Sequence, residues 1–181
     1  MGRDITTYVE VRDNRTNTWH ILPIKKQATR YVASDPEHKP QVLDKTEYEW
    51  VYASPYTSRN YELFEILNGD AYNAILDYQR GIPCDVSQEV KGLHEEWYDT
   101  DFERYVCFDE TWYTLAELET ALSNKDKYPK WKKWTDEEGE KHKEAGIRWD
   151  LKQFVNSIRY FVSLSGWYDA NDVRVIMWFD C

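Results

Sequence analysis

Alternating side chains near the N-terminus predict a β-hairpin. Residues 5–12 alternate between apolar or β-branched side chains and polar or aromatic ones, and this period of two is typical of a half-buried strand. Residues 13–17 have the composition of a turn. Residues 18–23 resume the extended pattern, and Pro23 ends that strand or places it at an edge.

The C-terminal stretch 172–181 predicts another strand, with apolar residues on both faces. One face carries Val173, Val175, Met177 and Phe179, and the other carries Ile176 and Trp178. Such a pattern indicates an interior strand that is covered on both sides. We expect it to pair near the N-terminal hairpin.

Residues 58–69 form the clearest helical pattern in the first half of the chain. Polar residues at its start are followed by a firmly apolar face, with Ser58 or Asn60 as the expected N-cap and Gly69 as the C-terminal stop. Residues 70–80 are expected to prolong helical structure until the Gly81-Ile82-Pro83 sequence breaks it.

Three further helices are predicted by capping signals and apolar stripes. Ser87 is the expected cap of a short helix, and Thr114 with Glu117 forms a capping box. Asp150 gives a capping-type signal before a strong amphipathic stripe over residues 151–162.

The remaining segments are shorter strands or polar excursions. Residues 46–52 and 105–108 have the composition of strands, whereas residues 25–45 predict a long polar excursion without order of its own. Residues 124–146 are highly charged and contain Lys130-Trp131-Lys132-Lys133-Trp134. Tryptophans among lysines can stack on nucleic-acid bases, but a solvated helix that uses them for packing is favoured. The prediction is one compact α+β domain over residues 1–181, with a mixed or antiparallel sheet packed against helices.

Composition narrows the class of protein. The formal net charge of -10 disfavours generic DNA or RNA binding. It suits a basic protein partner, imitation of a polyanion, or simply a solvated surface. The 3 cysteines contain no CxxC pair, which favours a reducing cytoplasm. No apolar run approaches the roughly 20 residues of a membrane span, and the N-terminus lacks the apolar region of a signal peptide.

Motif searches give no catalytic constellation and no expected cofactor or metal. Phosphate-binding glycine loops, zinc-protease motifs and EF-hand loops are absent from the sequence. The 4 histidines lack ligand spacing, so a zinc site would require distant segments to converge. Cys107, in an apolar run, is expected to be a buried structural thiol rather than a nucleophile.

Two polar clusters remain as the candidate ligand-binding site. The first cluster is Arg3, Asp4 and Glu10 at the first strand, and the second is Arg59, Asn60 and Tyr61 at a helix N-terminus. A helix N-terminus with an arginine favours an anion. The alternative is a structural clip in which Arg59 pairs with Asp4 or Glu10, and the clip is favoured.

Five segments, spread in order over nearly the whole chain, carry a resemblance. They are Gly2-Arg3-Asp4-Ile5 with Tyr8-Val9-Glu10; Arg59-Asn60-Tyr61 with Leu63-Phe64 and Ile66-Leu67; Gly81-Ile82-Pro83 with Asp85-Val86-Ser87; Trp112-Tyr113-Thr114-Leu115 with Glu117-Leu118; and Asp172-Val173-Arg174-Val175 with Trp178-Phe179-Asp180. In these the chain resembles a family of small uncharacterised proteins of tailed phages, prophages and bacteria. It departs from that family at residues 105–111, where the family has a turn containing His and Ser. The resemblance implies a phage or prophage setting but no particular activity.

The expected function is therefore that of a phage or prophage accessory protein that acts by binding inside the bacterial host cytoplasm. The partner would be a host protein, such as a defence or nucleic-acid enzyme to be inhibited, or a small anionic ligand such as a nucleotide to be sequestered. The alternative is a small metal-assisted enzyme acting on nucleotides or proteins, with Glu10, Asp4 or Asp180 as acid, base or metal ligand.

Overall fold

The fold is organised around an antiparallel sheet whose central strands are the two ends of the chain. The computed structural model describes residues 4–27, 29–31, 40–42, 48–55, 61–68, 74–76, 78–99, 104–105, 107–128, 131–135, 137–145, 148–166 and 168–180. The sheet has the order β2-β1-β12-β9. Its strands are β1 (Asp4–Asp13), β2 (Thr18–Ile21), β9 (Phe108–Thr114) and β12 (Val173–Asp180).

Strand β12 is the interior strand that the sequence predicted. It pairs with β1 from Asp4↔Asp180 to Val11↔Val173, and with β9 on its other side. Every side chain from Val173 to Phe179 is buried. Full burial of one large aliphatic or aromatic side chain stabilises a fold by about 1.5–3 kcal/mol, so this strand is a major contributor to stability.

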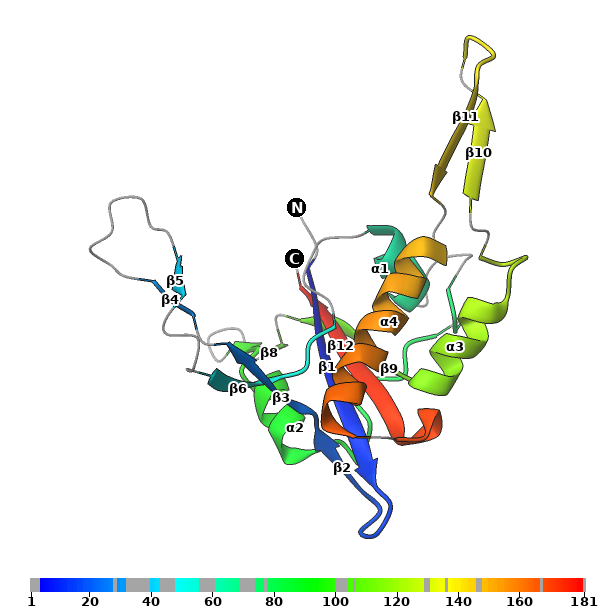
Figure 1. Cartoon of the computed structure of the whole chain (residues 1–181). Helices are drawn as coiled ribbons and strands as arrows, with labels where there is room; N and C mark the ends of the chain where they lie inside the picture. The colour runs from blue at the N-terminus through cyan, green and yellow to red at the C-terminus, as the bar shows by residue number, and fades with distance from the viewer. Residues whose placement is uncertain are drawn as a thin grey trace.

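Helices cover both faces of the sheet, which gives the α+β architecture. On one face lie α1 (Tyr61–Asn68), α3 (Leu115–Ser123) and α4 (Arg148–Ser165), whose apolar side chains pack with Val9, Val175 and Met177. On the other face Val90 of α2 (Gln88–Glu95) packs with Ile176 and Trp178. In Figure 1, α4 crosses β1 and β12, and the short helix η1 (Ala170–Asp172) leads into β12.

The capping predictions are confirmed at two helices and wrong at a third. The Ser87 hydroxyl accepts from the Val90 N–H, and Thr114 forms a complete capping box with Glu117. By contrast, α4 begins at Arg148, so Asp150 lies inside the first turn. In that position the negative charge of Asp150 still stabilises the helix through the positive end of its dipole.

The helical continuation predicted for residues 70–80 is wrong where the structure describes it. Residues 74–76 and 78–80 form bends and irregular chain. Tertiary hydrogen bonds replace helical ones, because the Ile75 N–H donates to the Ile66 carbonyl and the Gln79 side chain donates to the Asn68 carbonyl. Ser58, Asn60 and Gly69, the expected ends of the preceding helix, lie outside the described residues.

Paired strands occur in the first polar excursion, for which the sequence predicted no order of its own. In the first polar excursion, β4 (Thr29–Tyr31) pairs with β5 (Pro40–Val42). Strand β3 (Pro23–Gln27), which runs into this excursion, pairs with β6 (Tyr48–Tyr52), and β6 confirms the strand predicted for residues 46–52. A further short pair joins β7 (Tyr98–Asp99) to β8 (Arg104–Tyr105). In the first excursion, pairing of distant segments outweighs the local polarity.

The segment predicted as a solvated helix contains a projecting β-hairpin. Strands β10 (Trp131–Thr135) and β11 (Lys141–Ala145) pair with Trp134 opposite His142, and the hairpin extends away from the sheet (Figure 1). Gly139 in its turn has φ of 86°, a left-handed conformation that glycine adopts without strain. Charge composition did not reveal this turn. Among the described residues, no helix has both the length and the apolarity needed to cross a bilayer.

Candidate functional site

The interior strand carries a buried ion pair. Arg174 is 2% exposed and Glu10 is 0% exposed. The Arg174 Nε donates to the Glu10 carboxylate at 2.7 Å, and the other Glu10 oxygen accepts the Ser87 N–H at 2.8 Å. Two distant segments are thereby attached to the centre of the sheet.

A second carboxylate and two indole rings complete the surroundings of Arg174. Asp85 accepts from the guanidinium at 2.7 Å, and the Trp19 ring centroid lies 4.0 Å from the guanidinium carbon, with Trp112 at 5.8 Å. Burial works to raise the pKa of Asp85, but the hydrogen bond and charge of Arg174 outweigh it and hold this pKa below its ordinary value. Because the cation is fully partnered, this cluster is structural.

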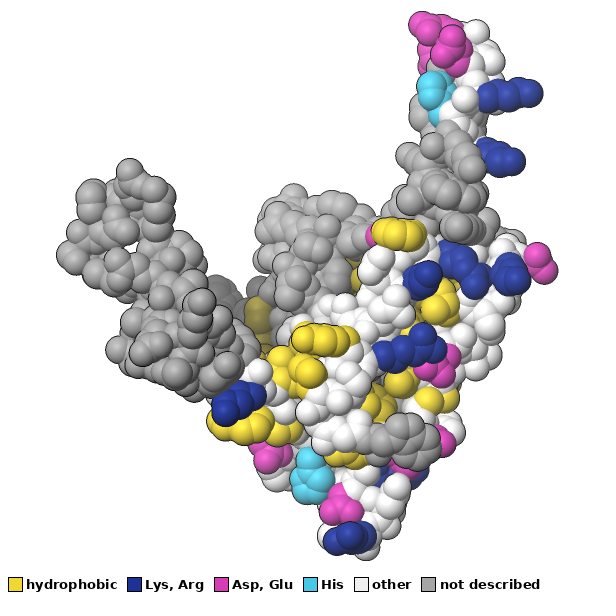
Figure 2. Space-filling model, viewed as in Figure 1, with side chains coloured by type: hydrophobic (Ala, Val, Ile, Leu, Met, Phe, Trp, Pro, Cys, Tyr) yellow, Lys and Arg dark blue, Asp and Glu magenta, His cyan; other side chains and the backbone are white. Residues whose placement is uncertain are grey.

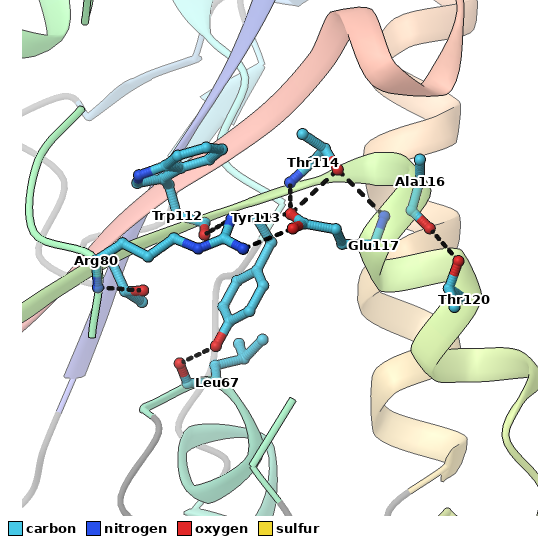
Figure 3. Close-up of polar contacts among 9 residues, drawn as sticks. Leu67, Arg80, Trp112, Tyr113, Thr114, Ala116, Glu117 and Thr120 are labelled. Atoms are coloured by element: carbon cyan, nitrogen blue, oxygen red, sulfur yellow. Dashed lines mark hydrogen bonds and ion pairs between the residues drawn. The ribbon is translucent and has the colours of Figure 1, made fainter. Parts of the chain in front are cut away.

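A second arginine joins the segment after α1 to the start of α3. Figure 3 shows Arg80 extending under Trp112 toward Glu117. The two side chains form a bidentate ion pair at 2.6 and 3.0 Å, and the guanidinium stacks at 4.4 Å from the Trp112 ring. In the same view the Tyr113 hydroxyl donates to the Leu67 carbonyl at 2.9 Å, and burial raises the pKa of Tyr113. These contacts join α1, β9 and α3, and the guanidinium of Arg80 is used within the fold and not offered to a ligand.

On the α2 side of the sheet, three potential metal ligands converge. The His94 Nε2 lies 3.4 Å from the Cys107 Sγ and 3.2 Å from the Glu110 Oε1, and the Sγ–Oε1 distance is 3.9 Å. His94 and Cys107 are buried, and the Glu110 side chain is 26% exposed. The hydrogen bond with His94 holds the pKa of Glu110 below its ordinary value, so the carboxyl is ionised at neutral pH.

A β-bulge brings Cys107 and Glu110 to the same face. Met177 pairs with Thr111 while Phe179 pairs with Phe108, so Asp109 and Glu110 together oppose Trp178. Asp109 has a left-handed φ of 54°. Residues three apart in a regular strand point to opposite faces, and one extra residue restores them to the same face.

A groove lies beside the β1–β2 hairpin, on the side away from α2. It has a volume of about 1060 Å³ and is bordered by the hairpin turn, β3, Trp50 of β6 and the end of α4. Trp50 is 69% exposed and is the register partner of Lys25. Figure 2 shows hydrophobic side chains (yellow) gathered over β3 and the neighbouring part of α4, with basic side-chain atoms (dark blue) at their edge.

The groove differs from the rest of the chain in charge. Its lining holds three basic side chains, Arg12, Arg15 and Lys25, against two acidic ones, Asp13 and Asp169, whereas the whole chain has a net charge of -10. Arg12 is bound to Asp172 through its Nε at 2.8 Å. Arg15 lies exposed in the hairpin turn. With Arg12 neutralised by Asp172, Arg15 and Lys25 balance Asp13 and Asp169, so the lining is close to neutral in a strongly acidic chain. The groove therefore combines an exposed indole with cationic side chains, features that suit a ring-bearing anion.

The structure describes only part of the site predicted from the sequence. Arg3, Arg59 and Asn60 lie outside the described residues, and for Asp4 and Tyr61 only the backbone position is described, in β1 and α1. Glu10 is buried, and both of its oxygens are engaged by Arg174 and Ser87. This arrangement does not support Glu10 as a metal ligand or as an acid or base in contact with substrate. The proposed clip and pocket at Arg59 stay predictions.

Sequence reasoning missed both the groove and the His94 cluster. One signal for His94 was present in the sequence. His94 lies four residues after Val90, and this spacing places both side chains on the same, buried face of the helix. No family model, curated protein or solved structure matches the chain. The resemblance to the phage-protein family therefore stays a prediction.

Proposed function

We propose that the protein acts by binding a small anionic, ring-bearing ligand of the nucleotide class in the groove beside the β1–β2 hairpin. The observation that carries this proposal is the exposed Trp50 in a groove that is also lined by the basic side chains Arg15 and Lys25. The phage or prophage setting in the bacterial cytoplasm is part of the proposal and rests on the sequence resemblance alone.

The chemistry of the groove supports this ligand class. An exposed indole stacks on any base, because every base has a π face, and such stacking is worth roughly 1–3 kcal/mol. Arg15 and Lys25 supply donors and positive charge for phosphate oxygens. The volume of about 1060 Å³ accommodates a nucleotide.

Calorimetric titration of the full chain with ATP, adenosine and inorganic phosphate tests the proposal. We expect ATP to bind more tightly than either fragment. Trp50→Ala should weaken ATP binding by the stacking energy of roughly 1–3 kcal/mol, which is about 5- to 150-fold in Kd, and Arg15→Ala should weaken ATP binding but not adenosine binding.

Matched controls come from α4. Trp149 is 48% exposed and Lys152 is also exposed, and neither lines the groove. Trp149→Ala and Lys152→Ala should therefore leave ATP binding unchanged. Absence of ATP binding in the wild type, or equal losses in Trp50→Ala and Trp149→Ala, would contradict the groove assignment.

A second candidate function is inhibition of a host protein that binds nucleic acid. It is favoured by the tip of the β10–β11 hairpin, where Glu137, Glu138 and Glu140 are exposed and acidic side chains cluster in Figure 2. Carboxylates on a projecting hairpin resemble a polyanion for a basic groove. Substituting all three by lysine should abolish capture of such a partner from bacterial lysate without affecting ATP binding. Unchanged capture by this variant would contradict the role of the hairpin tip.

A further inference from the structure

The cluster of His94, Cys107 and Glu110 has the spacing of three ligands around one metal ion. Zinc binds nitrogen at about 2.0–2.1 Å, oxygen at about 2.0–2.2 Å and thiolate sulfur at about 2.3 Å. In a tetrahedron these bond lengths place the ligand atoms about 3.3–3.6 Å apart. The three observed separations are 3.2, 3.4 and 3.9 Å, so only a small movement of the sulfur or the carboxylate would complete the geometry.

The arrangement differs from that of a nucleophilic triad. A Cys-His-acid triad uses both ring nitrogens, one toward the thiol and the other toward the carboxylate that orients the ring. Here the thiol and the carboxylate of Glu110 both lie at the Nε2 of His94. Convergence of three donor atoms on one region, all within 4.8 Å of one another, is the pattern of a metal site.

The surrounding packing holds two of the three ligands in place before any ion binds. The His94 ring packs edge-on against Trp178 with centroids 5.1 Å apart, and Cys107 belongs to the same buried cluster as Trp178 and Val90. The bulge at Asp109 turns Glu110 toward them. A preorganised ligand set gains affinity because less ordering is needed on binding.

We propose that His94, Cys107 and Glu110 form a zinc site with an open fourth position. A mixed nitrogen, sulfur and oxygen set suits the borderline-soft Zn²⁺ ion, and three protein ligands leave one position for water or another ligand. The partly exposed Glu110 side chain places the opening on its side of the cluster. On binding, the zinc–sulfur bond replaces the S–H bond of Cys107, and the thiol proton passes to solvent.

Cobalt titration of the full chain, after removal of metal by a chelator, tests this proposal. Bound Co²⁺ should give a thiolate-to-cobalt charge-transfer absorption that saturates at about one equivalent, and Zn²⁺ should displace it. The sequence holds two other cysteines, Cys84 and Cys181. The double variant Cys84→Ser/Cys181→Ser should keep the absorption, and Cys107→Ser should lose it.

Variants of the other two ligands separate metal binding from folding. His94→Gln and Glu110→Gln should each weaken cobalt binding by more than the roughly 10–100-fold that loss of an outer-sphere partner costs. His142→Gln on β11 is the matched histidine control and should bind as the wild type does. If the buried Cys107→Ser variant fails to fold by circular dichroism, the partly exposed Glu110→Gln variant decides the test.

Two results would overturn the zinc site. One is wild-type protein without the charge-transfer absorption, which would leave the cluster as a hydrogen-bonded network. The other is an absorption that survives Cys107→Ser or disappears in Cys84→Ser/Cys181→Ser, which would place the thiolate elsewhere. The site is separate from the groove, so loss of cobalt binding and loss of ATP binding are independent results.

Discussion

The buried pair of Glu10 and Arg174 provides the sharpest test of how the fold is held together. Glu10→Gln keeps the size of the side chain and an oxygen that accepts the Ser87 N–H, but it removes the charge beside Arg174. Removal of one partner from a buried pair typically costs 3–5 kcal/mol, because the other charge stays buried. Arg174 retains Asp85 at 2.7 Å, so we expect the lower end, about 3 kcal/mol.

Three comparison variants assign this loss to its cause. Asp85→Asn should cost less than about 1 kcal/mol, because the Asp85 side chain is 59% exposed. Glu10→Leu should cost about 1–3 kcal/mol more than Glu10→Gln, since the Ser87 N–H then lacks its acceptor. The double variant Glu10→Leu/Arg174→Met should be more stable than Glu10→Leu alone, because apolar side chains of similar volume then replace the whole ion pair.

Urea unfolding at neutral pH measures these differences, and thermal unfolding provides a second readout. For a chain of this size, 1 kcal/mol corresponds to about 2–4 °C in Tm, so Glu10→Gln should lower Tm by about 6–12 °C. The reasoning is refuted if Asp85→Asn destabilises as much as Glu10→Gln. It is also refuted if the double variant loses as much as the sum of Glu10→Leu and Arg174→Met.

Three further predictions concern the contacts around α3. Tyr113→Phe should lower the free energy of unfolding by about 1–3 kcal/mol, because the buried Leu67 carbonyl loses its donor; a loss near zero in urea unfolding would contradict this. Thr114→Ala should cost about 1 kcal/mol through loss of the N-cap, while Thr120→Ala, an exposed mid-helix change, serves as the control and should cost less. Burial works to raise the pKa of Glu117, but Arg80 outweighs it and lowers this pKa below 4.5. The ion pair therefore stabilises the fold above pH 4.5, and this stabilisation is lost as the pH falls through the lowered pKa. Between pH 7 and 3, the free energy of unfolding of Glu117→Gln should fall less than that of the wild type. Equal dependence of the two free energies on pH would refute the assignment.

Periodicity sufficed where local sequence and tertiary environment agree. Alternation in residues 5–12 and apolar residues on both faces of 173–179 predicted the two strands that form the centre of the sheet. The Thr114 capping box was equally readable, because both of its hydrogen bonds join residues three apart. These features depend on side-chain period and short-range bonding, which one sequence contains.

The candidate sites depended on contacts that no local pattern encodes. The six residues proposed from the sequence include Glu10, whose partner Arg174 is 164 positions away and was not anticipated. The groove likewise joins the first hairpin to the end of α4. Which cation meets which carboxylate is decided by strand register and by burial, and neither is visible in charge composition.

The sequence alone determined the α+β class, the two terminal strands and the helix caps at Ser87 and Thr114. Each of these follows from periods of two or 3.6 residues and from local hydrogen bonds. Only the tertiary structure decided the strands in the polar excursions and the convergence of His94, Cys107 and Glu110. An extra residue opposite Trp178 brings Cys107 and Glu110 to one face, and packing of α2 on that face brings His94 to them. Both depend on how distant strands align, so the chemistry of this cluster is a property of the fold.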